Sequence, residues 1–258
     1  MAFQNCKTAL ITGASSGLGR EFALQLAKAG THCILVARRK ERLEDVAREV
    51  RIAGVEAHVV ECDLAQSAER AKLKEIFLKH RVDMLVNNAG FGKIGPFAKI
   101  PVDVSLGQIE LNVSALVELS HFAVTAFQEQ KHGLIVNIAS TAAFAPIPYF
   151  SIYAATKSFV RDFSQTLNIE LQGSGIRVAV VCPGPTQTEF FDHAGSPGNM
   201  KANMMDAHKA VAEALAGIAK GESQIVLGIS NKALAAASVV VPRKVSMKIA
   251  SLFVTKRR

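Results

Sequence analysis

The chain has 258 residues, of which 49% are hydrophobic and 20% charged, ordinary values for one globular α/β domain with a full core. The formal net charge of +8 is concentrated in residues 229–258, which carry seven basic residues and no acid. The rest of the chain is close to neutral, which argues against a nucleic-acid-binding face.

No targeting or membrane-spanning segment is expected. The N-terminal residues lead directly into the apolar run at 8–12, and the longest apolar run, at 233–241, is too short to span a bilayer. The four cysteines are scattered without a CxxC pair, which is typical of small hydrophobic side chains in a reducing cytosol. The seven histidines show no metal-ligand spacing, so we expect a cytoplasmic protein without a metal.

Continuous apolar, β-branched runs alternate with amphipathic segments. The expected strands are 8–12, 32–37, 57–61, 84–87, 134–139, 177–182 and 224–227. The expected helices are 17–29, 40–53, 66–79, 105–130, 153–171 and 207–220. Continuous apolar strands are typical of a sheet buried on both faces. We therefore predict one α/β domain over 1–258, a doubly wound parallel sheet with helices on both faces and right-handed crossovers.

A glycine-rich segment, TGASSGLG, lies between the first expected strand and the first expected helix. Gly13 permits a tight turn, and Gly17 and Gly19 let the backbone approach a pyrophosphate at the positive end of the helix. The spacing is GxxxGxG rather than the commonest GxGxxG, so the prediction depends on the strand–turn–helix context. The alternative is that these glycines only shape a turn.

The ends of the second and third strands indicate which dinucleotide binds. Ala37 occupies the place where an acid often binds the ribose 2′-hydroxyl, and Arg38 and Arg39 follow it. Alanine leaves room for a 2′-phosphate and arginine binds one bidentately, so we predict NADP(H), with Arg38 favoured over Arg39. The alternative is a solvated helix start. Asp63 either caps a helix beginning at Gln66 or binds the adenine amino group.

Six motifs occur in a defined order along the chain. They are TGASSGLG at 12–19, NNAG at 87–90, ELNVSAL with Asn112, IVNIAST with Ser140, YAATK at 153–157 and PGPTQT at 183–188. Together they resemble the short-chain dehydrogenase/reductase family, in its compact single-domain, NADP-dependent branch. The match covers roughly residues 7–190 and continues more weakly to Gly228. The resemblance implies a Rossmann fold, a nicotinamide cofactor and the catalytic tetrad Asn112, Ser140, Tyr153 and Lys157.

The Tyr153–Lys157 pair also has a chemical rationale of its own. Hydride transfer to a carbonyl leaves an alkoxide that must gain a proton. Lowering a tyrosine pKa from about 10 to about 7 requires roughly 4 kcal/mol. A cation about 4 Å away supplies that order of energy at an effective dielectric of about 20, and Lys157 lies one helical turn after Tyr153. The alternative is a tyrosine beside a solvated lysine.

Ser140 and Asn112 have a functional and a structural interpretation each. Ser140 follows the fifth strand, where its hydroxyl would bind the substrate oxygen, or only cap the strand end. Asn112 lies inside a long expected helix, although asparagine is a mediocre helix former. Its side chain or a local kink would hold a water in a proton relay to Lys157. The alternative is a buried structural asparagine.

The resemblance extends to residues that would hold the cofactor and the substrate. The cofactor set is Gly13, Ser15, Ser16, Gly17, Leu18, Gly19, Arg38, Arg39, Asp63, Leu64, Asn88, Ala89, Gly90, Tyr153, Lys157, Pro183, Gly184, Thr186 and Thr188. The substrate set is Ser140, Tyr149, Tyr153 and Phe190, with an irregular loop at about 185–206. Apolar side chains nearby favour a lipophilic substrate. The implied enzyme interconverts a carbonyl and a secondary alcohol; the alternative is a non-catalytic NADP(H) sensor.

The basic tail at 229–258 has two interpretations. Val245, Ile249, Leu252 and Phe253 follow helical spacing, with polar residues between them. An amphipathic helix there would dock on its own body or a partner subunit, or lie on an anionic membrane surface as a peripheral contact. By resemblance, the long helices carrying Asn112 and Lys157 pack between subunits, so a homodimer or homotetramer is expected.

Overall fold

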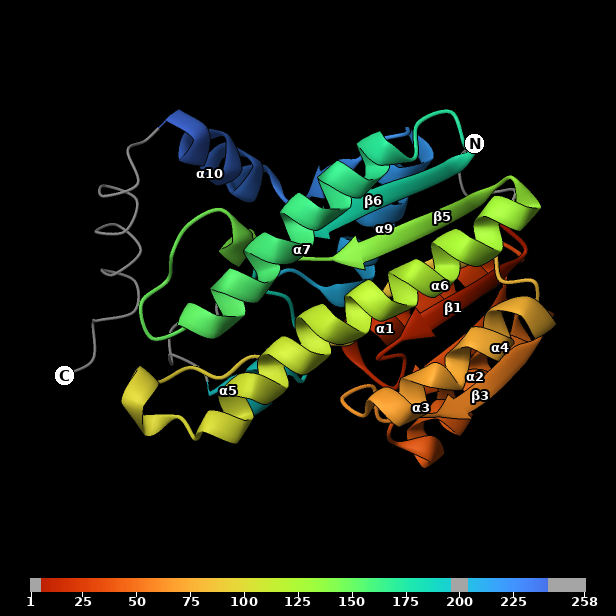
Figure 1. Ribbon diagram of the computed structural model, residues 1–258, viewed down its shortest axis with the longest axis horizontal. Helices are drawn as coiled ribbons and strands as arrows, with labels where there is room; N and C mark the ends of the chain where they lie inside the picture. Colours follow the sequence, from red (N-terminus) through yellow and green to blue (C-terminus); the bar gives the residue numbers. More distant parts are fainter. Residues whose placement is uncertain (1–5, 196–203, 241–258) are drawn as a thin grey trace.

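The computed structural model describes residues 6–195 and 204–240. Its strands form one parallel sheet in the order β3-β2-β1-β4-β5-β6-β7 (Figure 1). The strands are β1 (Thr8–Thr12), β2 (His32–Ala37), β3 (Ala57–Glu61), β4 (Met84–Asn87), β5 (Gly133–Ile138), β6 (Ile176–Cys182) and β7 (Gln224–Val226). The order reverses between β1 and β4, so the crevice that binds ligands in such sheets lies at their carboxyl ends. The predicted doubly wound parallel sheet is confirmed.

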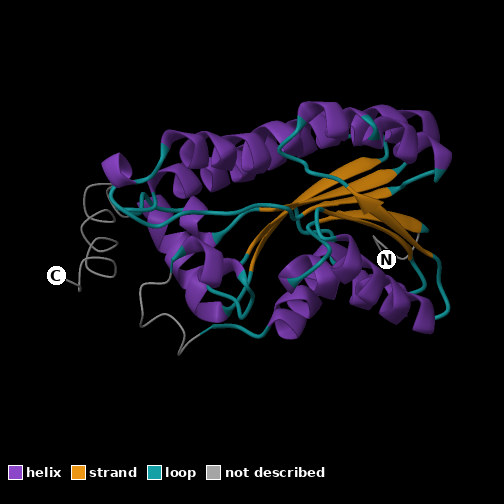
Figure 2. Ribbon diagram, turned by 90° about the horizontal axis from the view of Figure 1, so that it is seen from below, coloured by secondary structure: helices purple, strands orange, loops and turns teal. Residues whose placement is uncertain are grey.

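Helices cover both faces of the sheet, in two layers (Figure 2). They are α1 (Gly17–Lys28), α2 (Lys40–Ile52), α3 (Ser67–Ala71), α4 (Leu73–Lys79), α5 (Val102–Ile109), α6 (Ala115–Gln130), α7 (Ser151–Glu170), α8 (Phe190–Ala194), α9 (Ala207–Ala219) and α10 (Ile229–Val240). Short turns of other types are η1 (Phe97–Lys99), the π turn η2 (Glu110–Ser114) and η3 (Thr141–Ala143).

Alternate residues of each strand enter two separate cores. In β1, Ile11 packs with Phe22 of α1 and Val211 of α9 on one face. Leu10 points the other way, into the core formed with α4 and α6, which includes Phe77 and Phe127. Both faces of the strand are therefore buried, which explains why its sequence is continuously apolar rather than alternating.

Most element bounds agree with the sequence prediction, and the differences have local causes. Strands β1 to β4 match residue for residue, β5 is displaced by one residue towards the N-terminus, and β6 and β7 each differ by one residue at one end. The expected helix at 66–79 is divided at Lys72, whose backbone angles remain helical, so the interruption does not change the direction of the chain. The irregular stretch 183–206 contains the short helix α8, which was not expected.

The described part of the basic tail docks on its own body. Helix α10 begins directly after Gly228, with Ala235 buried beside β6 and β7 and Lys232 paired to Glu213 of α9 at 2.9 Å. The amphipathic pattern at 245–253 lies outside the described residues. Within the described ranges, no helix has the length and apolar character needed to cross a bilayer.

Candidate active site

The glycine-rich loop has the backbone shape of a phosphate cradle. Gly13 and Gly17 have φ values of +65° and +55°, in the left-handed region that favours glycine. A Cβ atom at Gly19 would lie 2.3 Å from the Gly13 carbonyl oxygen, so only glycine fits at that position. The loop leads into the N-terminus of α1, whose first turn holds no acidic residue. Free backbone N–H groups and the helix dipole suit an anionic phosphate there.

The NNAG segment after β4 is fastened to this loop. The Thr12 hydroxyl accepts hydrogen bonds from the backbone N–H groups of Asn88 and Ala89, at 2.9 and 3.0 Å. The Asn88 side chain donates to the Thr12 carbonyl at 2.9 Å. A Cβ atom at Gly90 would lie 2.9 Å from Asn112 Oδ1 and 3.5 Å from Lys157 Nζ. The segment therefore links the glycine loop to the tetrad.

Of the two predicted arginines, Arg39 is the one that contacts the glycine loop. Its Nη2 donates to the hydroxyls of Ser16 at 2.9 Å and Ser15 at 3.2 Å. Its Nη1 pairs with Glu189 at 3.0 Å. The Arg38 residue is exposed to solvent. Arg39 is therefore the arginine that lies beside the glycine loop, and both arginines remain predicted ligands of the 2′-phosphate.

The N-cap interpretation of Asp63 is wrong. Helix α3 begins at Ser67 with Gln66 in the N-cap position, too far along the chain for the Asp63 carboxylate. Asp63 Oδ1 instead accepts from the N–H of Ala65 at 3.1 Å, which closes a turn at the end of β3. Leu64 is buried in this turn, and its carbonyl accepts from Arg70 Nη1 at 2.7 Å. The adenine interpretation remains a prediction.

Asn112 lies in the π turn η2, which interrupts the expected long helix. Its Oδ1 accepts from the Phe91 N–H at 3.0 Å, and its Nδ2 donates to the Phe91 carbonyl at 2.9 Å and to Thr156 Oγ1 at 3.0 Å. Both amide hydrogens are therefore used within the protein, so the side chain acts as a structural bridge. A water relay at this position would have to use backbone groups that the π turn frees.

Ser140, Tyr153 and Lys157 come together at the carboxyl ends of β5 and β6. Lys157 Nζ donates to the Ile138 carbonyl at 2.7 Å and lies 5.7 Å from the centre of the Tyr153 ring. Ser140 Oγ accepts from the Ala142 N–H at 3.1 Å, so Ser140 also caps η3. Its structural and functional interpretations are therefore compatible.

The predicted lowering of the Tyr153 pKa is not found. Burial raises the pKa of Tyr153 to about 12, opposed by a hydrogen bond with Ser140. Burial also lowers the pKa of Lys157 to about 8, and its ammonium group is directed at the Ile138 carbonyl. Desolvation disfavours the charged forms of both groups and outweighs their mutual attraction at this separation.

Two phenylalanines cover the Tyr153 ring. Phe150 stacks on it with centroids 4.3 Å apart, and Phe190 of α8 lies tilted at 5.2 Å. Tyr149 is 43% exposed and has a φ of +63°, a strained value for a non-glycine residue. Phe150 was not among the predicted site residues, although it precedes Tyr153 by three residues, a helical spacing that predicts contact.

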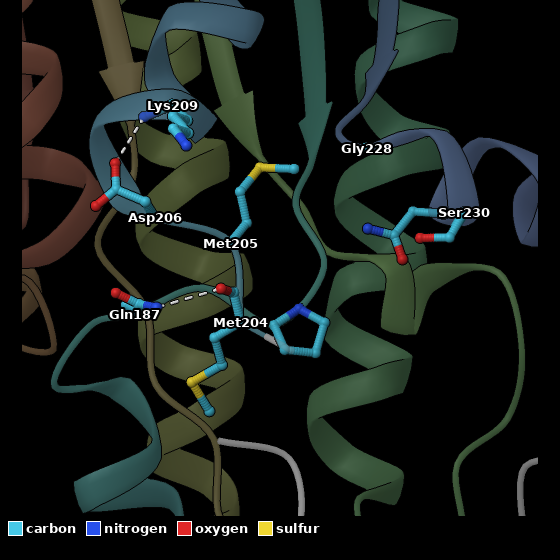
Figure 3. Close-up of a pocket in the computed structure, with 9 residues that line it drawn as sticks. Gln187, Met204, Met205, Asp206, Lys209, Gly228 and Ser230 are labelled. Atoms are coloured by element: carbon cyan, nitrogen blue, oxygen red, sulfur yellow. Dashed lines mark hydrogen bonds between the residues drawn. The ribbon is translucent and has the colours of Figure 1, made fainter. Parts of the chain in front are cut away.

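The PGPTQT segment lies against the glycine loop on one side and a solvent-open hollow on the other. A Cβ atom at Gly17 would lie 3.1 Å from Thr188, and Thr186 is buried with its hydroxyl donating to the Gly184 carbonyl at 3.0 Å. Figure 3 shows the hollow, about 490 Å³, which is lined by Pro185, Gln187, Met204, Met205, Asp206, Lys209, Gly228, Ser230 and Asn231. No tetrad residue lines it, so it is separate from Tyr153.

Comparisons with known proteins agree with this geometry. A family model described as short chain dehydrogenase matches residues 7–197. An uncharacterized oxidoreductase of Myxococcus xanthus is 31% identical over 227 residues, 87% of this chain and 88% of the relative. A short-chain dehydrogenase from Sphingobium yanoikuyae in complex with NADPH superposes with a TM-score of 0.84 at 36% identity, covering 91% and 93% of the two chains. A bulky-bulky ketone specific alcohol dehydrogenase from Comamonas testosteroni superposes with a TM-score of 0.80 at 32% sequence identity. The superposition covers 92% of this chain and 94% of the Comamonas chain.

Proposed function

Because the chain belongs to the short-chain dehydrogenase family, we propose that it is an NADP(H)-dependent oxidoreductase that interconverts a carbonyl and a secondary alcohol. The observation that carries the proposal is the convergence of Ser140, Tyr153 and Lys157 beside the glycine-rich loop. The Sphingobium relative binds NADPH, which supports the choice of cofactor.

The residues present fit a dinucleotide phosphate. The glycine loop and the N-terminus of α1 would hold the pyrophosphate, and Arg39 with Ser15 would hold the 2′-phosphate. Lys157 would hold the nicotinamide ribose, and Thr186 and Thr188 would hold the nicotinamide carboxamide. When bound, the nicotinamide supplies or accepts the hydride.

Tyr153 and Ser140 would handle the proton and the oxygen of the substrate. With a pKa raised to about 12, the Tyr153 phenol keeps its proton at neutral pH and is ready to donate it to the oxygen of a reduced carbonyl. The Ser140 hydroxyl would hydrogen-bond that oxygen as charge develops on it. In the reverse direction Tyr153 would accept the alcohol proton as a phenolate, which the positive charge of Lys157 would stabilise.

The surroundings of Tyr153 support a lipophilic substrate. Ala142, Phe150 and Ala154 are buried around it, and Ile94, Ile147 and Phe190 pack against this cluster. Apolar lining of this kind favours ketones or aldehydes with hydrocarbon substituents over small sugars. The Comamonas relative, described as specific for bulky-bulky ketones, supports the same class.

NADPH oxidation against a panel of ketones, aldehydes and 3-oxoacyl thioesters tests the reaction, with Tyr153→Phe as the control. We expect Tyr153→Phe to abolish turnover, because phenylalanine keeps the packing against Phe150 and Phe190 but has no proton to donate. NADPH binding should be nearly unchanged, measured by fluorescence titration. Equal activity in the two proteins would refute the mechanism.

The cofactor assignment is tested by comparing Arg39→Ala with Arg38→Ala. We expect Arg39→Ala to weaken NADPH binding by about tenfold or more, because a charge-assisted contact to phosphate is lost, and to leave NADH nearly unaffected. Arg38→Ala should have the smaller effect, since Arg38 is exposed. A uniform loss for both nucleotides would contradict the 2′-phosphate assignment.

We also propose a cytoplasmic location for the enzyme. Peripheral membrane contact through the basic residues at 243–258 stays a prediction, tested by liposome co-sedimentation of the full chain and of a chain that ends at residue 240. Unchanged liposome binding in the shortened chain would count against the membrane interpretation.

A further inference from the structure

Glu189 joins the substrate loop to Arg39 of the predicted 2′-phosphate site and to Arg42 of α2. Its Oε2 accepts from Arg39 Nη1 at 3.0 Å, and its Oε1 accepts from Arg42 Nη1. The hydrogen bond from Arg42, aided by Arg39, lowers the pKa of the Glu189 carboxyl, so the group is ionised at neutral pH. The contact spans 150 residues of sequence between Arg39 and Glu189, and no local pattern predicts it.

Arg39 cannot donate its full set of hydrogen bonds to Glu189 and to a cofactor phosphate at the same time. One end of its guanidinium faces the Ser15 and Ser16 hydroxyls, and the other end pairs with Glu189. A carboxylate and a phosphate monoester both bind arginine through the same fork of N–H donors. An incoming 2′-phosphate would therefore compete with Glu189 for these donors.

Glu189 also positions the ring that covers Tyr153. Its carbonyl accepts from the N–H groups of Asp192 at 3.1 Å and His193 at 3.4 Å, which forms the first turn of α8. The next residue, Phe190, places its ring 5.2 Å from that of Tyr153. The other end of α8 is held separately, where the Ala194 carbonyl accepts from the Ile94 N–H at 2.8 Å. Only the Glu189 end of the helix is fastened to the arginines.

We propose that Glu189 is an internal competitor for the 2′-phosphate, and that its displacement frees the first turn of α8 and moves Phe190 off Tyr153. This inference rests on the proposed NADP(H) function. It makes NADP(H), and not NAD(H), the nucleotide that opens the substrate site. The opposite arrangement, in which Glu189 holds the arginines ready for the phosphate, predicts binding changes of opposite sign.

Calorimetric titration separates these two arrangements. The probes are adenosine 2′,5′-bisphosphate and adenosine 5′-monophosphate, which differ only in the 2′-phosphate. Glu189→Gln should bind the bisphosphate about threefold to tenfold more tightly than wild type, the range expected for two partly exposed ion pairs. Binding of the monophosphate should not change, and the gain should shrink at high salt. Glu41→Gln, which removes an acid from the first turn of α2, is the matched control and should show no gain.

A single tryptophan reports on the ring above Tyr153. The chain contains no tryptophan, so Phe190→Trp introduces the only indole. Its emission should shift to longer wavelength when the bisphosphate binds, because the ring leaves an apolar cluster, and should not shift with the monophosphate. In the double variant with Glu189→Gln, the shifted emission should be present before any nucleotide is added. Neither probe carries a nicotinamide that would absorb this emission.

Weaker or unchanged binding of the bisphosphate by Glu189→Gln would overturn the proposal. So would an indole emission that stays constant while the bisphosphate binds. If wild type binds the two nucleotides equally, the NADP(H) assignment itself is wrong and the proposal falls with it. If wild type prefers the bisphosphate and Glu189→Gln does not increase that preference, the assignment stands and only the role of Glu189 is wrong.

Discussion

Burial decides the ionisation of the two central side chains of the site. Tyr153 and Lys157 are 8% and 5% exposed, and desolvation moves their pKa values in opposite directions, to about 12 and about 8. Both shifts favour the neutral form. At neutral pH the tyrosine therefore keeps its proton, while Lys157 titrates close to the physiological range.

Lys157 should make stability rise with pH. Between pH 8 and 10.5 the unfolded chain holds a proton on Lys157 that the folded chain has lost, so the free energy of unfolding increases over this window. The full shift corresponds to about 3 kcal/mol. From pH 7 to 9.5, wild type should therefore gain about 2 kcal/mol relative to Lys157→Met, measured by urea unfolding at both pH values.

The informative quantity is the difference in the free energy of unfolding between wild type and Lys157→Met, because other buried groups also titrate at alkaline pH. Burial raises the pKa values of Cys6, Cys33 and Cys62 above 9.0, which lowers the stability of wild type and variant alike at alkaline pH. Tyr153 contributes only above pH 10, where its raised pKa reduces stability. Parallel stability curves for the two proteins would show that Lys157 remains charged in the fold.

At the level of elements, one buried arginine ties α3 to the segment that carries Asn112. Arg70 is 4% exposed and pairs with Glu110 of η2 at 2.7 Å and with Glu118 of α6 at 2.5 Å. The free-energy cost of burying the Arg70 charge is offset by its contacts with these two carboxylates and with the Leu64 carbonyl. A charged side chain that is buried with partners fixes the relative position of the elements that supply them.

Arg70→Ala should lower the free energy of unfolding by about 2–3 kcal/mol, because it leaves a cavity and two glutamates without their partner. Arg48→Ala is the matched control. Arg48 pairs with Asp45 within α2, where both side chains are mostly exposed, so its loss should cost less than about 0.5 kcal/mol. Urea unfolding measures both changes, and equal costs would mean that the Arg70 pairs contribute no more than a surface contact.

At the level of the whole molecule, large apolar side chains remain exposed on the helices around the site. Val102 and Leu106 of α5 are 72% and 59% exposed, and Phe159 and Ile169 of α7 are 41% and 64% exposed. Large exposed apolar side chains that gather on neighbouring elements are typical of interfaces between proteins. It supports the predicted homodimer or homotetramer, with α5, α6 and α7 at the contact.

Light scattering after size exclusion should find wild type as a dimer or tetramer, and the double variant Leu106→Glu/Phe159→Glu as a smaller species. Charges at these positions would be desolvated in the interface, which is costly. Ile52→Glu is the control, since Ile52 is 85% exposed on α2, a helix that lies away from α5 and α7 (Figure 1). A monomeric wild type, or an unchanged mass for the double variant, would remove this surface as the contact.

The sequence by itself determined the sheet and the order of the motifs, and it predicted the tetrad. Apolar runs such as Thr8–Thr12 and His32–Ala37 coincide with strands because local periodicity follows directly from which faces are buried. The position of the glycine loop was also predictable from the sequence, because left-handed φ values and close backbone approach admit few residues other than glycine.

Only the tertiary structure decided how these residues are arranged and charged. It brought Arg39 rather than Arg38 to Ser15 and Ser16, and it set Glu189 against Arg39 across 150 residues of chain. It also raised the Tyr153 pKa where an i+4 lysine predicted a lower one. Side-chain partners and desolvation depend on which distant segments meet and how much water they exclude, and neither is encoded in local spacing.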